Sequence, residues 1–216
     1  MSWKYPFQRY LSYLYPITLE THHSDISGKL ELSLQNGKLV LDSATANYSY
    51  GSLHTVFQEV IQEVKFTSAR NKVLILGFGA GSIASILKLE KDLALKIDGV
   101  ELDPVVIELF NTHFKANRLA DVNLIQDDVI QFLKSSKEKY DYIFIDVFEN
   151  LKVPSTLLNQ QFIDLLQSVC YKHTQTAMNT MLKKDDGFVK LWNDSFKENA
   201  FSKQYDYSNL VLFARS

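Results

Sequence analysis

The feature that most constrains the fold is a repeated alternation between short apolar segments and segments with helical spacing, from residue 72 onward. Apolar runs of four to eight residues are typical of buried strands, and apolar residues at intervals of three and four are typical of amphipathic helices. The strands expected on this basis are Val73–Leu76, Lys96–Leu102, Val122–Gln126, Tyr142–Ile145, Thr176–Leu182 and Ser208–Ala214. Such an alternation predicts an α/β fold with a mostly parallel sheet and helices on both faces.

Helices are expected between these strands, at Ile83–Leu89, Pro104–Asn117, Val129–Lys134, Asn159–Cys170 and Gly187–Phe196. A further amphipathic helix is expected before the first strand, because apolar residues from Leu53 to Val64 recur at helical spacing. The strand Tyr142–Ile145 is apolar throughout, which indicates a central position in the sheet. Ligands on sheets of this kind bind beyond the carboxyl ends of the strands, so polar residues at those ends are the candidates for function.

The first part of the chain has a different pattern. Apolar and polar residues alternate on both sides of Asn36-Gly37, which is a strong signal for a β-hairpin, and Ile17–Thr21 supplies a third strand. We therefore divide the chain into a small N-terminal β-rich region, residues 1–51, and a nucleotide-binding domain, residues 52–216. The aromatic-rich start from Trp3 to Tyr15 fits either a cover over the site or a subunit contact in a homodimer, and periodicity does not choose between them.

A glycine-rich turn follows the strand Val73–Leu76 directly. Glycine allows a tight turn and a close approach of the backbone to a ligand. The dinucleotide pattern is G-x-G-x-x-G, whereas this chain has G-x-G-x-G, with Ser82 where the third glycine would stand. This spacing disfavours NAD and FAD. The residues expected to contact a cofactor here are Gly77, Phe78, Gly79, Ala80 and Gly81.

Carboxylates follow the next two strands. Glu101 ends the second strand, where it can accept hydrogen bonds from two ribose hydroxyls, and Leu102 beside it joins the expected cofactor set. Asp103 precedes Pro104 and is expected to cap the following helix. Asp127 and Asp128 end the third strand, where one carboxylate can accept from an adenine amino group and the Val129 amide can reach a ring nitrogen. A helix N-cap is the alternative role for either aspartate.

Asp146 ends the fourth strand and is the candidate catalytic residue. A carboxylate at the mouth of a pocket can bind an amine, or can take its proton as the amine attacks an electrophilic carbon. Glu149 lies in the loop that follows and is a candidate for substrate binding. A structural role at the strand end for Asp146, and a solvated loop position for Glu149, are the alternatives.

Charge and composition exclude several classes of function. The formal net charge is -2 and there is no long run of lysine or arginine, so we expect no nucleic-acid partner and no attraction to an anionic membrane. No segment is long and apolar enough to span a bilayer. The single cysteine, Cys170, allows no internal disulfide, and the five histidines show no metal-ligand spacing. A cytoplasmic protein without a bound metal is the expectation.

These motifs together resemble a class I S-adenosylmethionine (AdoMet) methyltransferase domain and, more narrowly, the spermidine synthase-like group. The resemblance covers most of the chain and lies in Val73–Gly81, Val100–Val106, Gln126–Leu133, Tyr140–Asp146 and Val153–Phe162. It implies a Rossmann-like AdoMet-methyltransferase fold with a small N-terminal β-hairpin region. It also implies AdoMet or decarboxylated AdoMet as cofactor, with the glycine turn at the methionine-derived part, Glu101 at the ribose, and Asp128 with Val129 at the adenine. Asp146 then stands where aminopropyltransferases keep the acid that helps to deprotonate the amine.

The chain departs from the aminopropyltransferase pattern at two points. Ala80 stands where the glycine loop of that group carries an aspartate, and Glu149 stands where it has a second aspartate. We therefore expect an AdoMet-dependent transferase that moves a methyl group to a small nucleophilic acceptor, such as an amine. Aminopropyl transfer in polyamine biosynthesis and a non-catalytic AdoMet-binding protein are the alternatives. Tyr50 and His54, in the aromatic segment that borders the active site in that group, complete the expected substrate-binding residues with Glu149.

Overall fold

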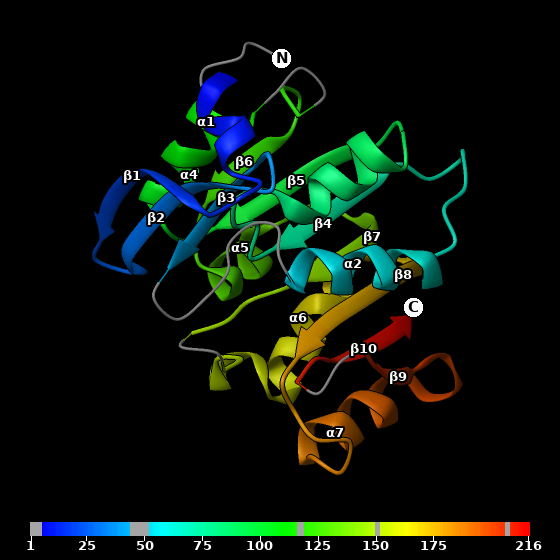
Figure 1. Ribbon diagram of the computed structural model, residues 1–216. Helices are drawn as coiled ribbons and strands as arrows, with labels where there is room; N and C mark the ends of the chain where they lie inside the picture. The colour runs from blue at the N-terminus through cyan, green and yellow to red at the C-terminus, as the bar shows by residue number, and fades with distance from the viewer. Residues whose placement is uncertain (1–5, 44–51, 116–118, 150–151, 206–207) are drawn as a thin grey trace.

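The computed structural model describes residues 6–43, 52–115, 119–149, 152–205 and 208–216, which form two sheets (Figure 1). The larger sheet has seven strands in the order β6-β5-β4-β7-β8-β10-β9. The strands β4 to β8 run parallel to one another, as the sequence predicts, and the apolar strand β7 lies at the centre. Their bounds are β4 Lys72–Leu76, β5 Lys96–Glu101, β6 Asn123–Gln126, β7 Tyr140–Ile145 and β8 Cys170–Thr180.

Two antiparallel strands close one side of this sheet. The strand β10 (Leu210–Arg215) pairs antiparallel with β8, and β9 (Phe201–Gln204) pairs antiparallel with β10. The sequence predicts β10 but not β9. The reason is that β9 is a short edge strand with mostly polar and exposed side chains, so it lacks the apolar run that marks the other strands.

Helices cover both faces of the large sheet. On one face lie α2 (Ser52–Glu63), α3 (Ser82–Ser85) with its π-helical continuation η1 (Ile86–Glu90), and α4 (Pro104–Leu109) with η2 (Phe110–Phe114). On the other face lie α5 (Val129–Ser135), α6 (Gln160–Ser168) and α7 (Gly187–Phe196), accompanied by the short 3-10 turns η3 (Ser155–Leu157) and η4 (Lys197–Asn199). Each predicted helix is present. The helix expected over Pro104–Asn117 ends earlier, at Phe114.

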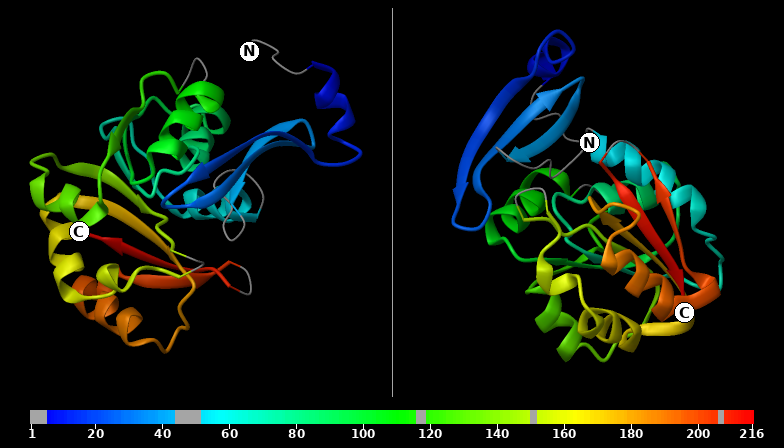
Figure 2. Two further views of the ribbon diagram at one scale, coloured as in Figure 1. Left: turned by 90° about the vertical axis from the view of Figure 1, so that its left-hand side faces the viewer. Right: turned by 90° about the horizontal axis from the view of Figure 1, so that it is seen from below.

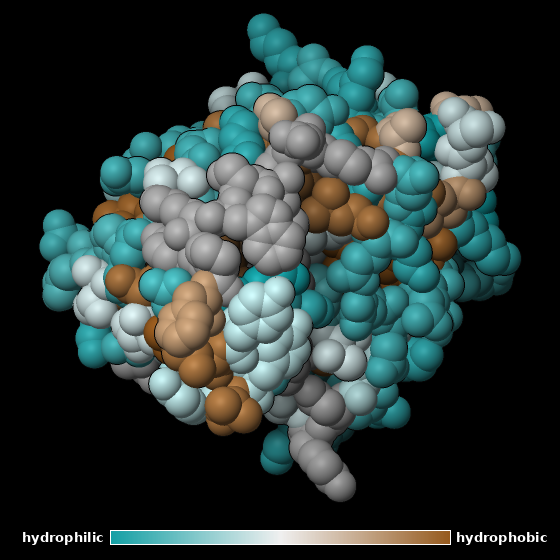
Figure 3. Space-filling view, turned by 45° about the horizontal axis from the view of Figure 1, so that its top comes forward, coloured by the Kyte–Doolittle hydropathy of each residue, from teal (hydrophilic) through white to brown (hydrophobic). Residues whose placement is uncertain are grey.

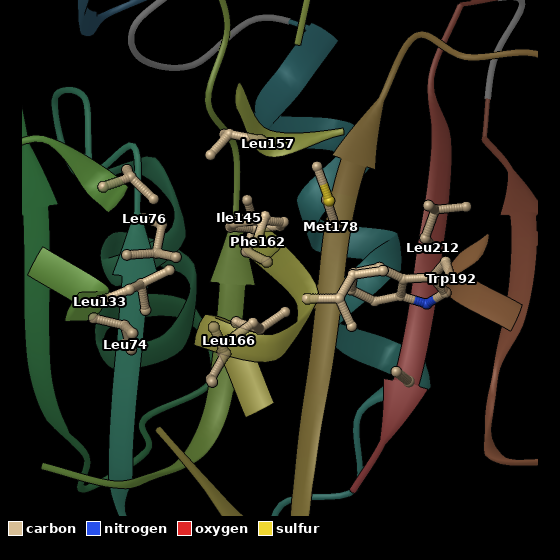
Figure 4. Close-up of a cluster of buried hydrophobic side chains, with 14 of the residues drawn as sticks. Leu74, Leu76, Leu133, Ile145, Leu157, Phe162, Leu166, Met178, Trp192 and Leu212 are labelled. Carbon is tan, nitrogen blue, oxygen red and sulfur yellow. The ribbon is translucent and has the colours of Figure 1, made fainter. Parts of the chain in front are cut away.

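The core follows from the alternation of side chains along the strands. In β4, Val73 and Ile75 join the cluster under α2 and α3, whereas Leu74 and Leu76 join the cluster under α5 to α7. The surface is mostly hydrophilic on the face shown in Figure 3, and Figure 4 shows the second of these clusters inside. Its largest member, Trp192, is fully buried, and its indole N–H donates to the Phe213 carbonyl at 3.0 Å.

The smaller sheet is an antiparallel three-stranded meander with α1 (Pro6–Leu11) at its outer end (Figure 2). Its strands are β1 (Ile17–Ser24), β2 (Gly28–Gln35) and β3 (Lys38–Ser43). The predicted hairpin is confirmed, because β2 and β3 pair up to Gln35 and Lys38 around the two-residue turn. Asn36 and Gly37 both have positive φ, 48° and 73°, which is the conformation that asparagine and glycine adopt with the least strain.

Asp103 joins the two sheets. Its carboxylate caps α4 by accepting from the Val105 amide at 2.8 Å, as predicted, and it also accepts from the hydroxyls of Ser24 and Ser27. Ser24 ends β1 and Ser27 lies in the turn between β1 and β2, so one buried carboxylate holds that turn against the start of α4. The division of the chain near residue 51 falls beside residues 44–51, which lie outside the described part, and stays a prediction.

Within the described residues, no helix combines the length and the apolar character that crossing a membrane requires.

The double role of Asp103 can be measured in the Asp103→Ala variant. The substitution removes a helix cap and two hydrogen bonds from the β1–β2 turn, so the free energy of unfolding should fall by about 3 kcal/mol in urea titration. The matched control is Asp186→Ala, because Asp186 caps α7 through the Phe188 amide without such a link between sheets. That control should lose about 1 kcal/mol. Equal losses in the two variants would contradict a joining role for Asp103.

Candidate functional site

A cavity of about 310 Å³ lies at the carboxyl ends of the parallel strands, where the topology predicts a ligand. Its size is at the lower end of the range for sites that hold small molecules. The loops after β4, β5, β6 and β7, the end of β8 and the β1–β2 turn all contribute to its wall. The lining residues that carry the argument are Gly77, Gly79, Glu101, Asp127, Asp146 and Asn179.

The glycine turn after β4 has a backbone that only glycine fits easily. Gly77, Gly79 and Gly81 have φ of 77°, 56° and 85°. A Cβ on Gly77 would stand within 3.0 Å of the Asp146 backbone, and a Cβ on Gly81 would meet the Phe110 ring at a similar distance. The amides of Gly77 and Phe78 both donate to the Val100 carbonyl, at 3.0 and 2.9 Å. The turn is therefore packed between the ends of β5 and β7.

Glu101 binds the same turn from the side of β5. One of its oxygens, Oε2, accepts from the Gly79 amide at 2.8 Å, and Oε1 accepts from the amides of Leu102 and Asp103 at 2.9 and 3.0 Å. Burial raises the pKa of the Glu101 carboxyl, and the three amides act in the opposite direction. A carboxylate offers about four acceptor positions, so this one retains capacity for a ligand hydroxyl. Glu101 thus shapes the turn and faces the cavity at once.

Among the residues expected to contact a cofactor, Phe78, Ala80 and Gly81 have surroundings that differ from those of the others. The Phe78 side chain is buried beneath the turn, edge-on to Phe110 with ring centroids 4.8 Å apart. Ala80 is buried among apolar residues of α4 and the small sheet, such as Val106 and Leu32. Neither Ala80 nor Gly81 lines the cavity, because the turn points its second half away from the ligand side.

The end of β6 brings both expected aspartates to the cavity. Asp128 is the N-cap of α5, with its Oδ1 accepting from the amides of Ile130 and Gln131 at 2.9 and 3.1 Å. Asp127 accepts from the Asp128 amide at 2.8 Å and is partly buried. Val129 and the half-exposed Leu102 also line the cavity. Asp128 thus has the capping role, and Asp127 is the carboxylate with fewer hydrogen bonds to the protein.

Asp146 is a second acid of the cavity whose pKa is raised by burial. Burial raises the pKa of its carboxyl to about 7, and a hydrogen bond from Asn179 opposes the rise. Asn179 Nδ2 donates to Asp146 Oδ1 at 3.0 Å, and the amide oxygen of Asn179 is buried without a partner in the described structure. An unpaired buried acceptor is costly, so this oxygen is suited to a donor on a ligand. A perturbed acid in a cleft is a candidate functional group.

Asn179 is a residue that the sequence analysis missed. It stands in β8 between Met178 and Thr180, at the carboxyl end of the strand, where the residues from Thr176 onward are all buried. A polar residue at that point was the available signal. Ile26 and Ser27 of the β1–β2 turn and Asn209 at the start of β10 were also missed. They reach the cavity through tertiary packing that no local pattern reports.

Of the residues expected to bind the substrate, one lines the cavity, one does not, and one lies outside the described part of the chain. Glu149 lines the cavity and is exposed. His54 does not line it: it belongs to α2 and its side chain is buried, with Nε2 2.7 Å from Oε1 of Glu90. The Glu90 carboxylate also accepts from Gln58. The hydrogen bond between His54 and Glu90 explains why the His54 side chain faces η1 instead of the cavity. Tyr50 lies in residues 44–51, outside the described part of the chain.

The charged side chains among the described residues that line the cavity are all acidic. Five carboxylate side chains line it, and none of the described lining residues is lysine, arginine or histidine; the five are Glu101, Asp127, Asp128, Asp146 and Glu149. Such a wall favours cationic ligands and disfavours phosphates. In the described ranges, no group of three or more His, Cys, Asp and Glu side chains has the arrangement of a metal site.

Comparison with known proteins agrees with this geometry. A family model described as the spermine/spermidine synthase domain matches residues 54–208, which is most of the chain. The chain belongs to the spermine/spermidine synthase domain family. The resemblance inferred from the motifs is thereby confirmed.

Curated relatives of this spermine/spermidine synthase domain are distant and longer. A probable polyamine aminopropyl transferase from Bifidobacterium longum is 30% identical over 97 residues, 45% of this chain and 21% of that protein. A polyamine aminopropyltransferase from Vibrio vulnificus is 29% identical over 101 residues, 45% of this chain and 33% of that protein. The matched region therefore spans no more than about a third of either relative.

Solved structures share the fold. A probable spermidine synthase from Corynebacterium glutamicum superposes with a TM-score of 0.65 at 16% identity, over 91% of this chain and 76% of the other. Human methyltransferase-like protein 13, in complex with SAH, gives a TM-score of 0.58 at 17% identity, over 74% of this chain and 78% of the other. The Rossmann-like methyltransferase fold expected from the sequence is confirmed.

The raised pKa of Asp146 gives this spermine/spermidine synthase domain a specific dependence of stability on pH. In the folded chain the Asp146 carboxyl keeps its proton up to about pH 7. In the unfolded chain the same carboxyl has its ordinary pKa of 3.8 and loses the proton near that pH. The folded state binds more protons in that window, so the contribution of Asp146 to stability falls as pH rises from about 4 to 7 and is constant above. An Asp146→Asn variant lacks this slope.

The unfolding free energy of Asp146→Asn minus that of the unaltered chain should therefore increase as the pH rises from about 4 to 7. We expect a change on the order of 2 to 3 kcal/mol, since water that enters the cavity screens part of the effect. Urea titrations at a series of pH values measure it. A gap that stays constant between pH 4 and 7 would show that Asp146 is not perturbed by burial.

Proposed function

We propose that this domain binds an adenosyl sulfonium donor on the glycine turn and transfers an alkyl group from it to an amine. The observation that carries the proposal is the acidic cavity at the strand ends, with Asp146 and Glu101 on its wall and no cationic side chain among its described lining residues. A sulfonium and an ammonium are both cations, so both reactants suit that wall.

The donor would lie across the ends of β4, β5 and β6. Glu101 has acceptor capacity left for a ribose hydroxyl after its three amide contacts. At β6, Asp127 can accept from the adenine amino group, and the Val129 amide heads α5, where no intrahelical partner exists for it. These groups bind a nucleoside without a phosphate. They are the basis for preferring AdoMet-type ligands to NAD.

Charge bears on which donor is preferred. AdoMet carries a carboxylate that decarboxylated AdoMet lacks, and an acidic wall without a described cation repels it. The amides of Gly77, Phe78, Gly79 and Gly81 all have partners within the protein, so none of these is free to receive that carboxylate. Decarboxylated AdoMet fits this wall better, and the reaction we favour is therefore aminopropyl transfer.

Asp146 would act as the base for the acceptor amine. The amine nitrogen attacks the carbon next to the sulfonium, the carbon–sulfur bond breaks with its electrons going to sulfur, and the thioether nucleoside leaves. The proton released by the amine passes to Asp146, whose pKa of about 7 suits proton transfer near neutral pH. The unpartnered oxygen of Asn179, beside Asp146, can accept a second hydrogen bond from the same amine.

Methyl transfer from AdoMet is the second candidate, and Ala80 is the observation that favours it. The glycine turn offers no carboxylate at that position, and the methyl group of Ala80 is buried against α4 and the small sheet. The glycine turn thus supplies no carboxylate to the cavity, and desolvating the second ammonium of a dicationic acceptor without a partner is costly. A small monoamine would then be the acceptor.

Two measurements test the proposal. Thermal unfolding with AdoMet, decarboxylated AdoMet, NAD and ADP identifies the donor, since a ligand of the folded state raises the melting temperature. Mass spectrometry of turnover mixtures with diamines and monoamines then identifies the leaving nucleoside. Methylthioadenosine supports aminopropyl transfer, and S-adenosylhomocysteine supports methyl transfer. A response to neither sulfonium donor, or a larger response to NAD, would overturn the proposal.

The role of Asp146 is tested by Asp146→Asn in the same assays. Donor binding should stay within about threefold, whereas turnover should fall by about 100-fold or more, the usual contribution of a positioned base. Asp164→Asn is the control, because Asp164 is exposed on α6 and bonds only to Gln160 in the described structure. It should leave both quantities unchanged. Full activity of Asp146→Asn would remove Asp146 from the mechanism.

A further inference from the structure

A second cavity, of about 460 Å³, lies at the edge of the large sheet opposite to the ligand cavity. The strand β8 runs between the two, from Cys170 at the second cavity to Asn179 at the ligand cavity. We call the second one the amino-edge cavity, because it lies where the parallel strand β8 begins. The ends of α6, α7 and β10 complete its wall, and the end of β10 is marked C in Figure 1. The lining residues that carry the argument are Cys170, Tyr171, Lys172, Phe196, Lys197 and Arg215.

Cationic side chains line the amino-edge cavity without any acid. Lys172, Lys197 and Arg215 come from β8, η4 and β10, and each is exposed. None of the described lining residues is aspartate or glutamate, and no carboxylate in the described part of the chain forms an ion pair with these three cations. Lys139 lies close by, because its Nζ donates to the Cys170 carbonyl at 3.2 Å. Four positively charged side chains therefore gather at one cavity.

The helix ends at this cavity explain only part of its charge. The helices α6 and α7 both end there, and each helix end carries about half a negative charge, which favours a cation beside it. Together the two ends offset about one of the positive charges. If the chain ends at Ser216, the carboxylate of that residue offsets a second. The nearby Glu198 is exposed and does not line the cavity. About two positive charges remain, which matches the charge of a phosphate dianion.

The backbone of Lys197 is strained. Its φ is 53° and its ψ is -133°, a region that residues with a Cβ rarely adopt. Lys197 follows α7 directly, where glycine is the usual residue because it takes a positive φ without strain. Strain of this kind gathers at positions where the side chain has a function. At Lys197 it places a cation on the wall of the cavity.

The rest of the wall is uncharged and partly aromatic. Cys170 and Phe196 are buried and form its inner part. Burial raises the pKa of the Cys170 thiol, so the thiol stays neutral near pH 7, and its Sγ donates to the Leu166 carbonyl at 3.2 Å. Tyr171 is 47% exposed beside Lys172, and its ring can stack on a flat ligand group. Cations around a neutral wall suit an anion and disfavour an amine.

We propose that the amino-edge cavity is a second ligand site, which binds the phosphate group of a small molecule through Lys172, Lys197 and Arg215. The guanidinium of Arg215 can contact two phosphate oxygens at once, and the lysines supply further charge-assisted hydrogen bonds. Inorganic pyrophosphate and a nucleotide share this chemistry, and Tyr171 gives a nucleotide an additional contact. The ligand cavity, with its acidic wall, selects ligands of the opposite charge. Binding at the amino-edge cavity does not depend on the reaction at the other edge of the sheet.

Isothermal titration calorimetry of the full chain with inorganic pyrophosphate, at fixed ionic strength, tests this site. The unaltered chain should bind pyrophosphate, and Arg215→Ala should raise the dissociation constant by about tenfold or more, because charge-assisted hydrogen bonds are lost. The matched control is Lys96→Ala, since Lys96 is an exposed cation at the start of β5 that does not line the cavity. It should leave the affinity unchanged. No binding by the unaltered chain, or an equal loss of affinity in the control, would overturn the proposal.

The variant Lys197→Gly separates a role in binding from a role in folding. Glycine fits the backbone at this position, so the melting temperature should not fall, whereas the dissociation constant for pyrophosphate should rise by about tenfold or more. An affinity equal to that of the unaltered chain would overturn the assignment of Lys197. Addition of methylthioadenosine should not displace pyrophosphate. Displacement would place the anion in the ligand cavity and would overturn the second site.

Titration with ADP distinguishes the two sources of phosphate. If ADP binds more tightly than pyrophosphate, and Tyr171→Ala removes the difference while leaving pyrophosphate binding unchanged, the site takes a nucleotide. Equal affinities for the two probes assign it to the phosphate alone. In both cases Arg215→Ala should weaken the two probes together, and an ADP affinity that is insensitive to Arg215→Ala would contradict phosphate recognition here.

Discussion

The carboxylate of Glu101 is the group on which the arrangement of the cavity depends. It ends β5 and accepts from the backbone on two sides, from the glycine turn after β4 and from the start of the loop that leads to α4. Three amides that would otherwise face a partly buried space are satisfied by one side chain. The glycine turn can then lie against the Asp146 backbone, where no other residue type would fit at Gly77. A cavity with a defined floor follows from this single interaction.

The same interaction extends to the small sheet. The Asp103 amide donates to Glu101, and the Asp103 carboxylate receives the hydroxyls of Ser24 and Ser27. A continuous set of hydrogen bonds thus runs from the glycine turn to the β1–β2 turn, whose residues Ile26 and Ser27 complete the wall of the cavity. The end of the small sheet that carries the β1–β2 turn therefore closes the ligand site.

Local patterns in the sequence predict most of the fold. The central strand β7, the Asn36-Gly37 hairpin and the glycine turn are recognisable because each depends on residues adjacent in the chain. Glu101 and Asp146 could be placed at one edge of the sheet because parallel strands end together. Tertiary packing decides the rest: Ala80 turns into the apolar cluster under the small sheet, and His54 turns to Glu90. Asn179 is one of several polar residues of β8, and only the packing of the strand shows that it reaches the cavity. The short edge strand β9 has too few apolar residues to be seen at all.

The most direct test of the account is a crystal structure of this chain with methylthioadenosine bound. The account predicts adenosine over the ends of β4, β5 and β6, with a ribose hydroxyl at hydrogen-bond distance from Glu101. The adenine amino group should lie next to Asp127, and the sulfur on the side of the cavity where Asp146 and Asn179 lie. A nucleoside bound elsewhere, or one whose ribose faces away from Glu101, would contradict it.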